Sequence, residues 1–282
     1  MDIKLLALDL DGTALHSNNT LSPAVAEAIE SAAENGIEIV AASGRPFGSM
    51  PPEVLRLRGV NYVISSNGAA IHDRTGRWIH ETPLRESAVL QLLALTADVD
   101  LIWEAFLDGE TYTDNRYLRD PIKYGCTPAY VSYVQGSRGG LNDMRRYIYE
   151  NRCRLDSVEY VCPDKALRES VRKRLEQHLQ NVYITSSSAN FVEFMDENAT
   201  KSAALRRLCD LLSVPLSQTA ACGNADNDAD MIACAGLGAA VANASESCKR
   251  AADVILPSNN DDGVVTLIDL ILNNNTIPPK AV

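Results

Sequence analysis

Short apolar runs in this chain stop abruptly at small clusters of polar residues. The run 3–8 ends at Asp9, and the run 37–42 ends at Ser43-Gly44-Arg45. Between them lies a helical pattern that opens at Ser22-Pro23, a serine N-cap followed by proline at the first helical position. Buried strands that alternate with helices predict an α/β fold with a doubly wound, Rossmann-like parallel sheet, in which ligands bind beyond the carboxyl ends of the strands.

The middle of the chain, residues 84–191, follows a less regular pattern that holds most of the tyrosines. The elements expected there are helices over 86–97, 142–149 and 165–180 and strands over 130–134, 157–161 and 182–185. After this segment the first pattern returns, with a helix from Lys201 and strands over 219–222 and 237–241. We therefore expect residues 1–83 and 192–282 to form one core and 84–191 to form an inserted α/β domain. The polar tail after residue 273 is expected to fray.

Composition narrows the classes of partner. The formal net charge of -11 argues against nucleic acid and against an anionic membrane surface as partners. The chain has seven cysteines and no CxxC pair, which is typical of a reduced, cytoplasmic protein rather than of a disulfide scaffold. No apolar run approaches the ~18 residues of a membrane helix, and no signal peptide is expected. The sequence leaves the oligomeric state open.

Two carboxylates, Asp9 and Asp11, stand where the first strand ends, followed by Gly12-Thr13. A turn at the glycine would rotate the second acid relative to the first. One acid can then attack phosphorus to form an acyl phosphate, while the other transfers protons. An Asx-type turn is the structural alternative. An EF-hand loop is disfavoured because Thr20 stands where its closing glutamate belongs.

Three further polar clusters each have a plain structural alternative. Ser43-Gly44 offers a hydroxyl and backbone N–H groups to a phosphate, or forms only a turn. Lys201 opens a helix and either binds phosphate oxygens or lies solvated at the surface. The loop 223–231, with Asn224, Asn227 and Asp228, supplies oxygen ligands that suit Mg²⁺, or is an acidic helix start. All lie at predicted carboxyl ends of one sheet, which favours a shared site.

With these motifs, the chain resembles the haloacid dehalogenase (HAD) superfamily, and within it the Cof-type (subclass IIB) phosphatases with a C2B cap. The resemblance covers almost the whole chain. The segment 9–13 fits the first family motif, 43–45 the second, Lys201 the third and 223–231 the fourth. Ser66-Asn67-Gly68-Ala69 fits a stretch typical of the subgroup, and 259–264 resembles its closing segment. The inserted segment stands where such a cap belongs.

The resemblance implies a role for each matching residue. Asp9 would be the nucleophile and Asp11 the general acid/base, which would ligate the metal through its backbone carbonyl. The phosphoryl group would be held by Leu10, Ser43, Gly44, Lys201 and Asn227. The metal ligands would be Asp9, Asp11, Asn224 and Asp228. Asn224 is a departure, because the family usually has aspartate there; we expect weaker metal binding. Val241-Ala242-Asn243 departs from the more common Met-Gly-Asn.

The expected activity is Mg²⁺-dependent hydrolysis of a small phosphorylated metabolite, with sugar phosphates as the family-level expectation. Arg45, which follows the phosphate seat, and Arg116 and Arg119, in a basic and aromatic stretch of the expected cap, are candidate substrate contacts; a solvated cap surface is the alternative for the last two. Two rival activities stay open. A phosphomutase would use the same site, and the amide at Asn224 is compatible with a catalytically weak, phospholigand-binding regulator.

Overall fold

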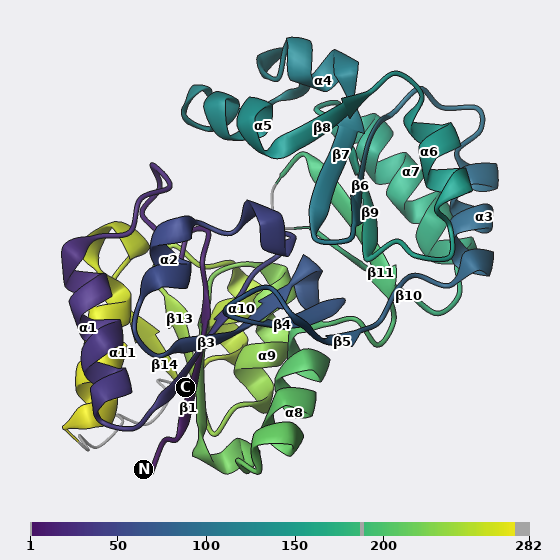
Figure 1. Ribbon diagram of the computed structural model, residues 1–282. Helices are drawn as coiled ribbons and strands as arrows, with labels where there is room; N and C mark the ends of the chain where they lie inside the picture. Colours follow the sequence, from purple (N-terminus) through teal and green to yellow (C-terminus); the bar gives the residue numbers. More distant parts are fainter. Residues whose placement is uncertain (1, 187–188, 274–282) are drawn as a thin grey trace.

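The structure is a computed structural model that describes residues 2–186 and 189–273 (Figure 1). It contains two separate sheets, one of eight strands and one of six. The tail expected to fray lies outside the described residues. No helix in the described part of the chain is long and apolar enough to cross a membrane.

The eight-stranded sheet has the order β14-β13-β12-β1-β2-β3-β4-β5. Its first six strands in this order pair in parallel, and β4 and β5 add an antiparallel edge. The bounds are β1 Leu5–Asp9, β2 Glu38–Ala42, β3 Val60–Ser65, β4 Ala70–Asp73, β5 Trp78–Glu81, β12 Thr219–Gly223, β13 Leu237–Val241 and β14 Val254–Leu256. The predicted doubly wound parallel sheet is confirmed, with β1 between β12 and β2.

Helices cover both faces of this sheet, as the alternating pattern predicts. Helices α1 (Pro23–Glu34) and α11 (Gly263–Leu272) share one apolar core with α2 (Pro52–Arg56) and α10 (Glu246–Ala251), while α8 (Lys201–Leu212) packs with α9 (Ala229–Cys234) on the other face. The predicted N-cap is confirmed: Ser22 Oγ accepts from Val25 N at 3.1 Å, and Pro23 opens α1.

The six-stranded sheet has the order β10-β11-β9-β6-β7-β8 and is antiparallel except between β7 and β8. Its strands are β6 Ile102–Leu107, β7 Glu110–Asp114, β8 Arg138–Leu141, β9 Ser157–Val161, β10 Val182–Thr185 and β11 Phe191–Asp196. Helices α3 (Glu86–Leu95), α6 (Met144–Glu150) and α7 (Lys165–His178) bury one face, and the short α4 (Asn115–Arg119) follows β7. Three glutamates from the neighbouring strands β6, β9 and β11 lie side by side on the opposite face: Glu104, Glu159 and Glu193.

Two sequence predictions need correction. The strand expected over 130–134 is wrong, because α5 spans Val131–Ser137 after a short turn at Pro128–Tyr130. Its valines and tyrosines favour a strand by composition, but Val134 is buried against neighbouring elements as part of a helix. The boundary at 191 also fails in detail: β11 pairs with β9 and β10, so the second sheet continues to Asp196.

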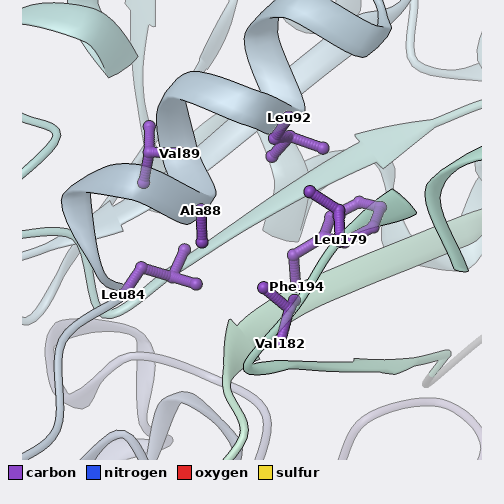
Figure 2. Close-up of a pocket in the computed structure, with 7 residues that line it drawn as sticks. All are labelled: Leu84, Ala88, Val89, Leu92, Leu179, Val182 and Phe194. Carbon is purple, nitrogen blue, oxygen red and sulfur yellow. The ribbon is translucent and has the colours of Figure 1, made fainter. Parts of the chain in front are cut away.

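An apolar recess lies between α3 and the six-stranded sheet (Figure 2). Its lining residues carry only hydrocarbon side chains: Leu84, Ala88, Val89, Leu92, Leu179, Val182 and Phe194. Since none of these side chains offers a donor or an acceptor, the recess is a packing seam and has no group suited to a phosphorylated ligand.

Candidate active site

Three of the predicted polar clusters follow strands β1, β2 and β12 and meet at one edge of the eight-stranded sheet, and Lys201 reaches the same edge from the start of α8. In register, Asp9 at the end of β1 lies opposite Ala42 of β2, and its neighbour Leu8 lies opposite Cys222 of β12. Parallel pairing therefore places the turn after each of these strands beside Asp9. Gly12 makes the first turn possible, because its φ is +80° and a Cβ atom there would lie 2.6 Å from Asn224 Nδ2.

Lys201 joins two of the predicted acids. Its Nζ donates to Asp9 Oδ1 at 2.7 Å and to Asp228 Oδ1 at 2.6 Å, and its side chain is fully buried. Asp228 Oδ2 in turn accepts from the backbone N–H groups of Asn224 and Ala225, at 2.9 and 3.0 Å. A buried ammonium is stable only when it is paired in this way. Lys201 is therefore a buried part of the site and not a solvated surface lysine.

The close charges of Asp9, Asp228 and Lys201 shift the pKa values of Asp9 and Lys201. Burial and, after it, the nearby carboxylate of Asp228 raise the pKa of Asp9 to about 7, against the opposing effect of Lys201. Burial lowers the pKa of Lys201, but the two carboxylates outweigh it and the net shift is upward. Negative charge thus remains in excess around Asp9.

The same residues offer oxygen atoms that suit a divalent cation. Asp9 Oδ2 is buried and has no hydrogen-bond partner in the described structure. Asn224 Oδ1 faces the turn that follows Asp9, where it accepts from Thr13 Oγ1 at 3.2 Å. Among the described residues, no group of three His, Cys, Asp or Glu side chains is arranged to hold a metal. A cation here would need the amide of Asn224 and backbone oxygen besides Asp9, and this oxygen-only donor set fits Mg²⁺.

Asp11 is turned away from Asp9 and paired with Arg45. The Arg45 Nε and Nη2 atoms donate to Asp11 Oδ2 and Oδ1 at 2.7 and 2.5 Å, a two-bond pair. Arg45 also donates to Asn19 Oδ1 and to the Ser49 carbonyl. Its side chain is 7% exposed, whereas that of Asp11 is 37% exposed. The predicted substrate contact Arg45 is thus engaged with the predicted proton carrier.

The second sheet covers this pair through α5. The ring of Tyr133 lies between two guanidinium groups, 4.3 Å from Arg45 Cζ and 5.1 Å from Arg138 Cζ. Arg138 is itself paired with the buried Glu104, Nε to Oε1 at 2.8 Å. Arg45 therefore links Asp11 on the first sheet to an aromatic and ionic cluster on the second.

The predicted phosphate seat borders the same region. Ser43 is buried, and its Oγ accepts from Arg45 N at 3.1 Å. A Cβ atom on Gly44 would lie 3.1 Å from Asn67 Oδ1, so this backbone passes close to Asn67. Asn227 reaches the same place, with Nδ2 donating to Asn67 Oδ1 at 2.7 Å. The side chain of Leu10 is buried in the apolar core, so only its backbone can face a phosphate.

The other two candidate substrate contacts have partners within the second sheet. Arg116 donates to Asp114 and Asp100, with distances from 2.8 to 3.0 Å. Arg119 Nε donates to the carbonyl of Asn115 at 3.2 Å. None of their hydrogen bonds in the described part of the chain reaches the Asp9 cluster, and a role in substrate binding stays a prediction.

Sequence reasoning missed two asparagines that tie the loops together. Asn243 Nδ2 donates to the Gly12 carbonyl at 2.8 Å, and its Oδ1 accepts from Asn259 N at 3.0 Å. Asn259 Nδ2 donates to the Leu15 carbonyl at 2.9 Å. Both positions lie in segments noted only for their family pattern. Their position just after β13 and β14, at the same sheet edge, was the available signal.

Comparison with known proteins agrees with this geometry. The profile of the haloacid dehalogenase-like hydrolases matches residues 6–268. Phosphatase YwpJ of Bacillus subtilis is 30% identical over 96% of this chain and 100% of its own length. The solved structure of a haloacid dehalogenase-like hydrolase from B. subtilis is 28% identical, with a TM-score of 0.83 over 95% of this chain and 99% of that one. The HAD subclass IIB sugar phosphatase BT4131 shares the fold at 17% identity, with a TM-score of 0.79 over 94% and 98%.

Fold, site and relatives together define a phosphatase enzyme of the α/β class. More specifically, the chain belongs to the haloacid dehalogenase-like hydrolases and is a Cof-type phosphatase that shares the fold of a subclass IIB enzyme.

Proposed function

We propose that the protein hydrolyses a small phosphorylated metabolite through an aspartyl phosphate on Asp9. The observation that carries this proposal is the buried trio in which Lys201 fixes one oxygen of Asp9 and leaves the other, Oδ2, without a partner. A carboxylate held by one oxygen is oriented for attack with the other. Asp228 keeps Lys201 in place, and Lys201 offsets charge beside a bound phosphate.

Asp11 is the proposed proton carrier. Asp9 attacks phosphorus in line, the phosphorus–oxygen bond to the leaving alcohol breaks, and Asp11 gives that alcohol its proton. Asp11 then takes a proton from the water that hydrolyses the aspartyl phosphate. Its greater exposure suits this exchange of protons. The pairing with Arg45 must loosen in each cycle, because the two N–H donors of Arg45 occupy both carboxylate oxygens that would carry the proton.

Mg²⁺ is the proposed cofactor, held by the Asp9 carboxylate, the Asp11 backbone carbonyl and Asn224, with support from Asp228. When bound, it would neutralise phosphate charge in the transition state. The excess negative charge around Asp9 supports a cation at this position. Ser43, Gly44 and the Leu10 backbone are proposed to hold the phosphoryl oxygens.

We further propose that the six-stranded sheet and its helices form a cap that contacts the leaving group, and that this group is a sugar. Tyr133 of α5 packs on Arg45, and Tyr130 precedes the same helix; these hydroxyl-bearing rings beside Asp11 and Arg45 support a leaving group with several hydroxyls. Two of the similar proteins are named phosphatases, one of them a sugar phosphatase. A cytoplasmic location is proposed from the seven free cysteines.

The test is release of inorganic phosphate from p-nitrophenyl phosphate and from a panel of sugar phosphates, with Mg²⁺ and after chelation. Turnover is expected only with the cation, and Asp9→Asn should lower kcat to background because the amide cannot attack phosphorus. Asp210→Asn, which changes an exposed carboxylate on α8, is the control and should retain activity. An active Asp9→Asn enzyme would exclude the proposed nucleophile. Conversion of a sugar phosphate to its isomer without phosphate release would favour a phosphomutase.

A further inference from the structure

The turn Ser66-Asn67-Gly68 carries backbone strain at a buried position. All three residues have positive φ, at 48°, 57° and 105°, and all three are buried. Gly68 is needed there, because a Cβ atom would lie 2.2 Å from the carbonyl oxygen of Thr200, just before Lys201. Such strain persists only where the surroundings fix the turn, and it is typical of functional sites. The proposed chemistry gives this turn no role.

Asn67 is the middle link of a buried chain of hydrogen bonds. Its Nδ2 donates to Glu193 Oε2 on β11 of the second sheet at 2.6 Å. Its Oδ1 accepts from Asn227 Nδ2 at 2.7 Å. The three side chains belong to residues that are only 2 to 7% exposed. The chain therefore connects the second sheet to a candidate phosphate-binding residue without water between them.

Glu193, the charged residue of this hydrogen-bonded series, sets the direction of the hydrogen bonds. A carboxylate oxygen only accepts, so Glu193 must face the NH₂ group of Asn67. The Asn67 oxygen then faces Asn227, which must turn its own NH₂ group toward Asn67. As a result the Asn227 Oδ1 atom is buried with no partner in the described structure. A buried unsatisfied oxygen is costly, and this one follows from the position of Glu193.

We propose that Asn67 is a positioning residue that couples the position of Glu193 to the orientation of the Asn227 amide. While the second sheet is docked, this coupling withholds the Asn227 NH₂ group from a bound phosphate. The inference rests on the proposed function, since it concerns the phosphate seat of that site. It reverses the expectation that Asn227 simply donates to the phosphoryl group. Movement of Glu193 away from Asn67 frees both amides to turn.

The experiment measures the dissociation constant of inorganic phosphate by calorimetry, with and without Mg²⁺, for the full-length protein. Glu193→Gln supplies an amide that can donate to Asn67 Oδ1. The direction of both hydrogen bonds can then reverse. Asn67 would donate to Asn227 Oδ1, and the Asn227 NH₂ group would be left for phosphate. Phosphate should bind more tightly, on the order of tenfold, because a hydrogen bond to an anion is gained.

A double-mutant cycle isolates the relay. Asn67→Gly removes the side chain but keeps the left-handed backbone that glycine accepts. In that background Glu193→Gln should change the phosphate dissociation constant by less than about twofold, because its route to Asn227 is cut. Glu159→Gln is the matched control: it is a buried glutamate one strand away, has no hydrogen bond to Asn67 among those described, and should leave phosphate binding unchanged.

The outcomes separate the two proposals. An unchanged dissociation constant in Glu193→Gln, or an equal change in both backgrounds, overturns the relay even if turnover still depends on Asp9. Coupling in phosphate binding without any turnover supports the relay and overturns the phosphatase proposal. A wild-type protein that neither binds nor releases phosphate overturns both.

Discussion

At the scale of single residues, Asn224 is the position where the chain departs from the pattern of its family. Asn224 is held by two hydrogen bonds: its Oδ1 accepts from Thr13 Oγ1, and its backbone N–H donates to Asp228. Its Nδ2 fits against Gly12, which has no side chain to obstruct it. The amide is thus accommodated without distortion, and the loss relative to aspartate is one negative charge beside the proposed cation.

Asn224→Asp is expected to tighten Mg²⁺ binding on the order of tenfold, because a carboxylate adds one ligand charge. The change is isosteric, so the turn at Gly12 should hold. Calorimetric titration with Mg²⁺ in the absence of phosphate measures the effect. Asn260→Asp, at an exposed asparagine bonded to Ser17, is the control with the same chemical change. Equal affinities in wild type and Asn224→Asp would remove Asn224 from the metal site.

The sequence could place Asp9 and Asp228 together because strand order brings the ends of β1 and β12 to one edge. Lys201 follows β11 of the other sheet, so only the family resemblance placed it in the same site. The sequence could not show that Arg45 binds Asp11, because that pairing depends on a side-chain rotamer and on cover from Tyr133 in the second sheet. Glu193 was missed for the same reason. Its contact with Asn67 spans 126 positions and exists only after the two sheets dock.

At the scale of elements, the turn between β3 and β4 is fixed by a close approach of two backbones. Gly68→Ala should destabilise the protein by about 2–4 kcal/mol, because it adds a methyl group against the Thr200 carbonyl and strains a φ of 105°. Urea unfolding monitored by circular dichroism measures this.

Gly136→Ala is the matched control for that change. Gly136 lies in α5 with nothing within 4 Å of the added Cβ, and alanine there should be neutral or stabilising by up to about 1 kcal/mol. A Gly68→Ala protein as stable as wild type would show that the turn can move away from α8.

Three helix starts were predicted to the residue, at Glu86, Lys165 and Lys201. Asp164 and Thr200 cap two of these helices by accepting from backbone N–H groups in the first turn. Helix α5 was missed because its valines and tyrosines are typical of a strand. Strands β4, β5, β7 and β8 were not assigned, because they are short and rich in polar residues. The more apolar strands β6 and β11 were also missed.

At the scale of the whole molecule, Asp156 lies at the junction of the two sheets. Its backbone N–H donates to Phe106, and its carboxyl accepts from Ser66 Oγ at 3.5 Å. Burial and, to a smaller extent, the nearby charges of Glu81 and Asp108 raise the pKa of Asp156 to about 7. The folded protein therefore retains a proton that the unfolded chain releases above about pH 4.

The raised pKa of Asp156 makes stability fall as pH rises from about 4 to about 7, because the unfolded state binds fewer protons in that window. Asp156→Asn removes this dependence and should be more stable than wild type at pH 8, on the order of 2 kcal/mol, with a smaller difference near pH 4. Chemical unfolding at several pH values gives both slopes. Parallel slopes for the two proteins would assign the pH dependence to other groups.

The last strand of the second sheet ends at Asp196, and helix α8 begins at Lys201. Only the stretch 197–200 separates them, and Thr200 is already the N-cap of that helix. A displacement of the six-stranded sheet has almost no slack to absorb before it pulls on the lysine that bridges Asp9 and Asp228. Lengthening this link with a few glycines would uncouple movement of the six-stranded sheet from the alignment of the Lys201 ammonium group. A different sheet joined through the original short link would still transmit its movement to Lys201.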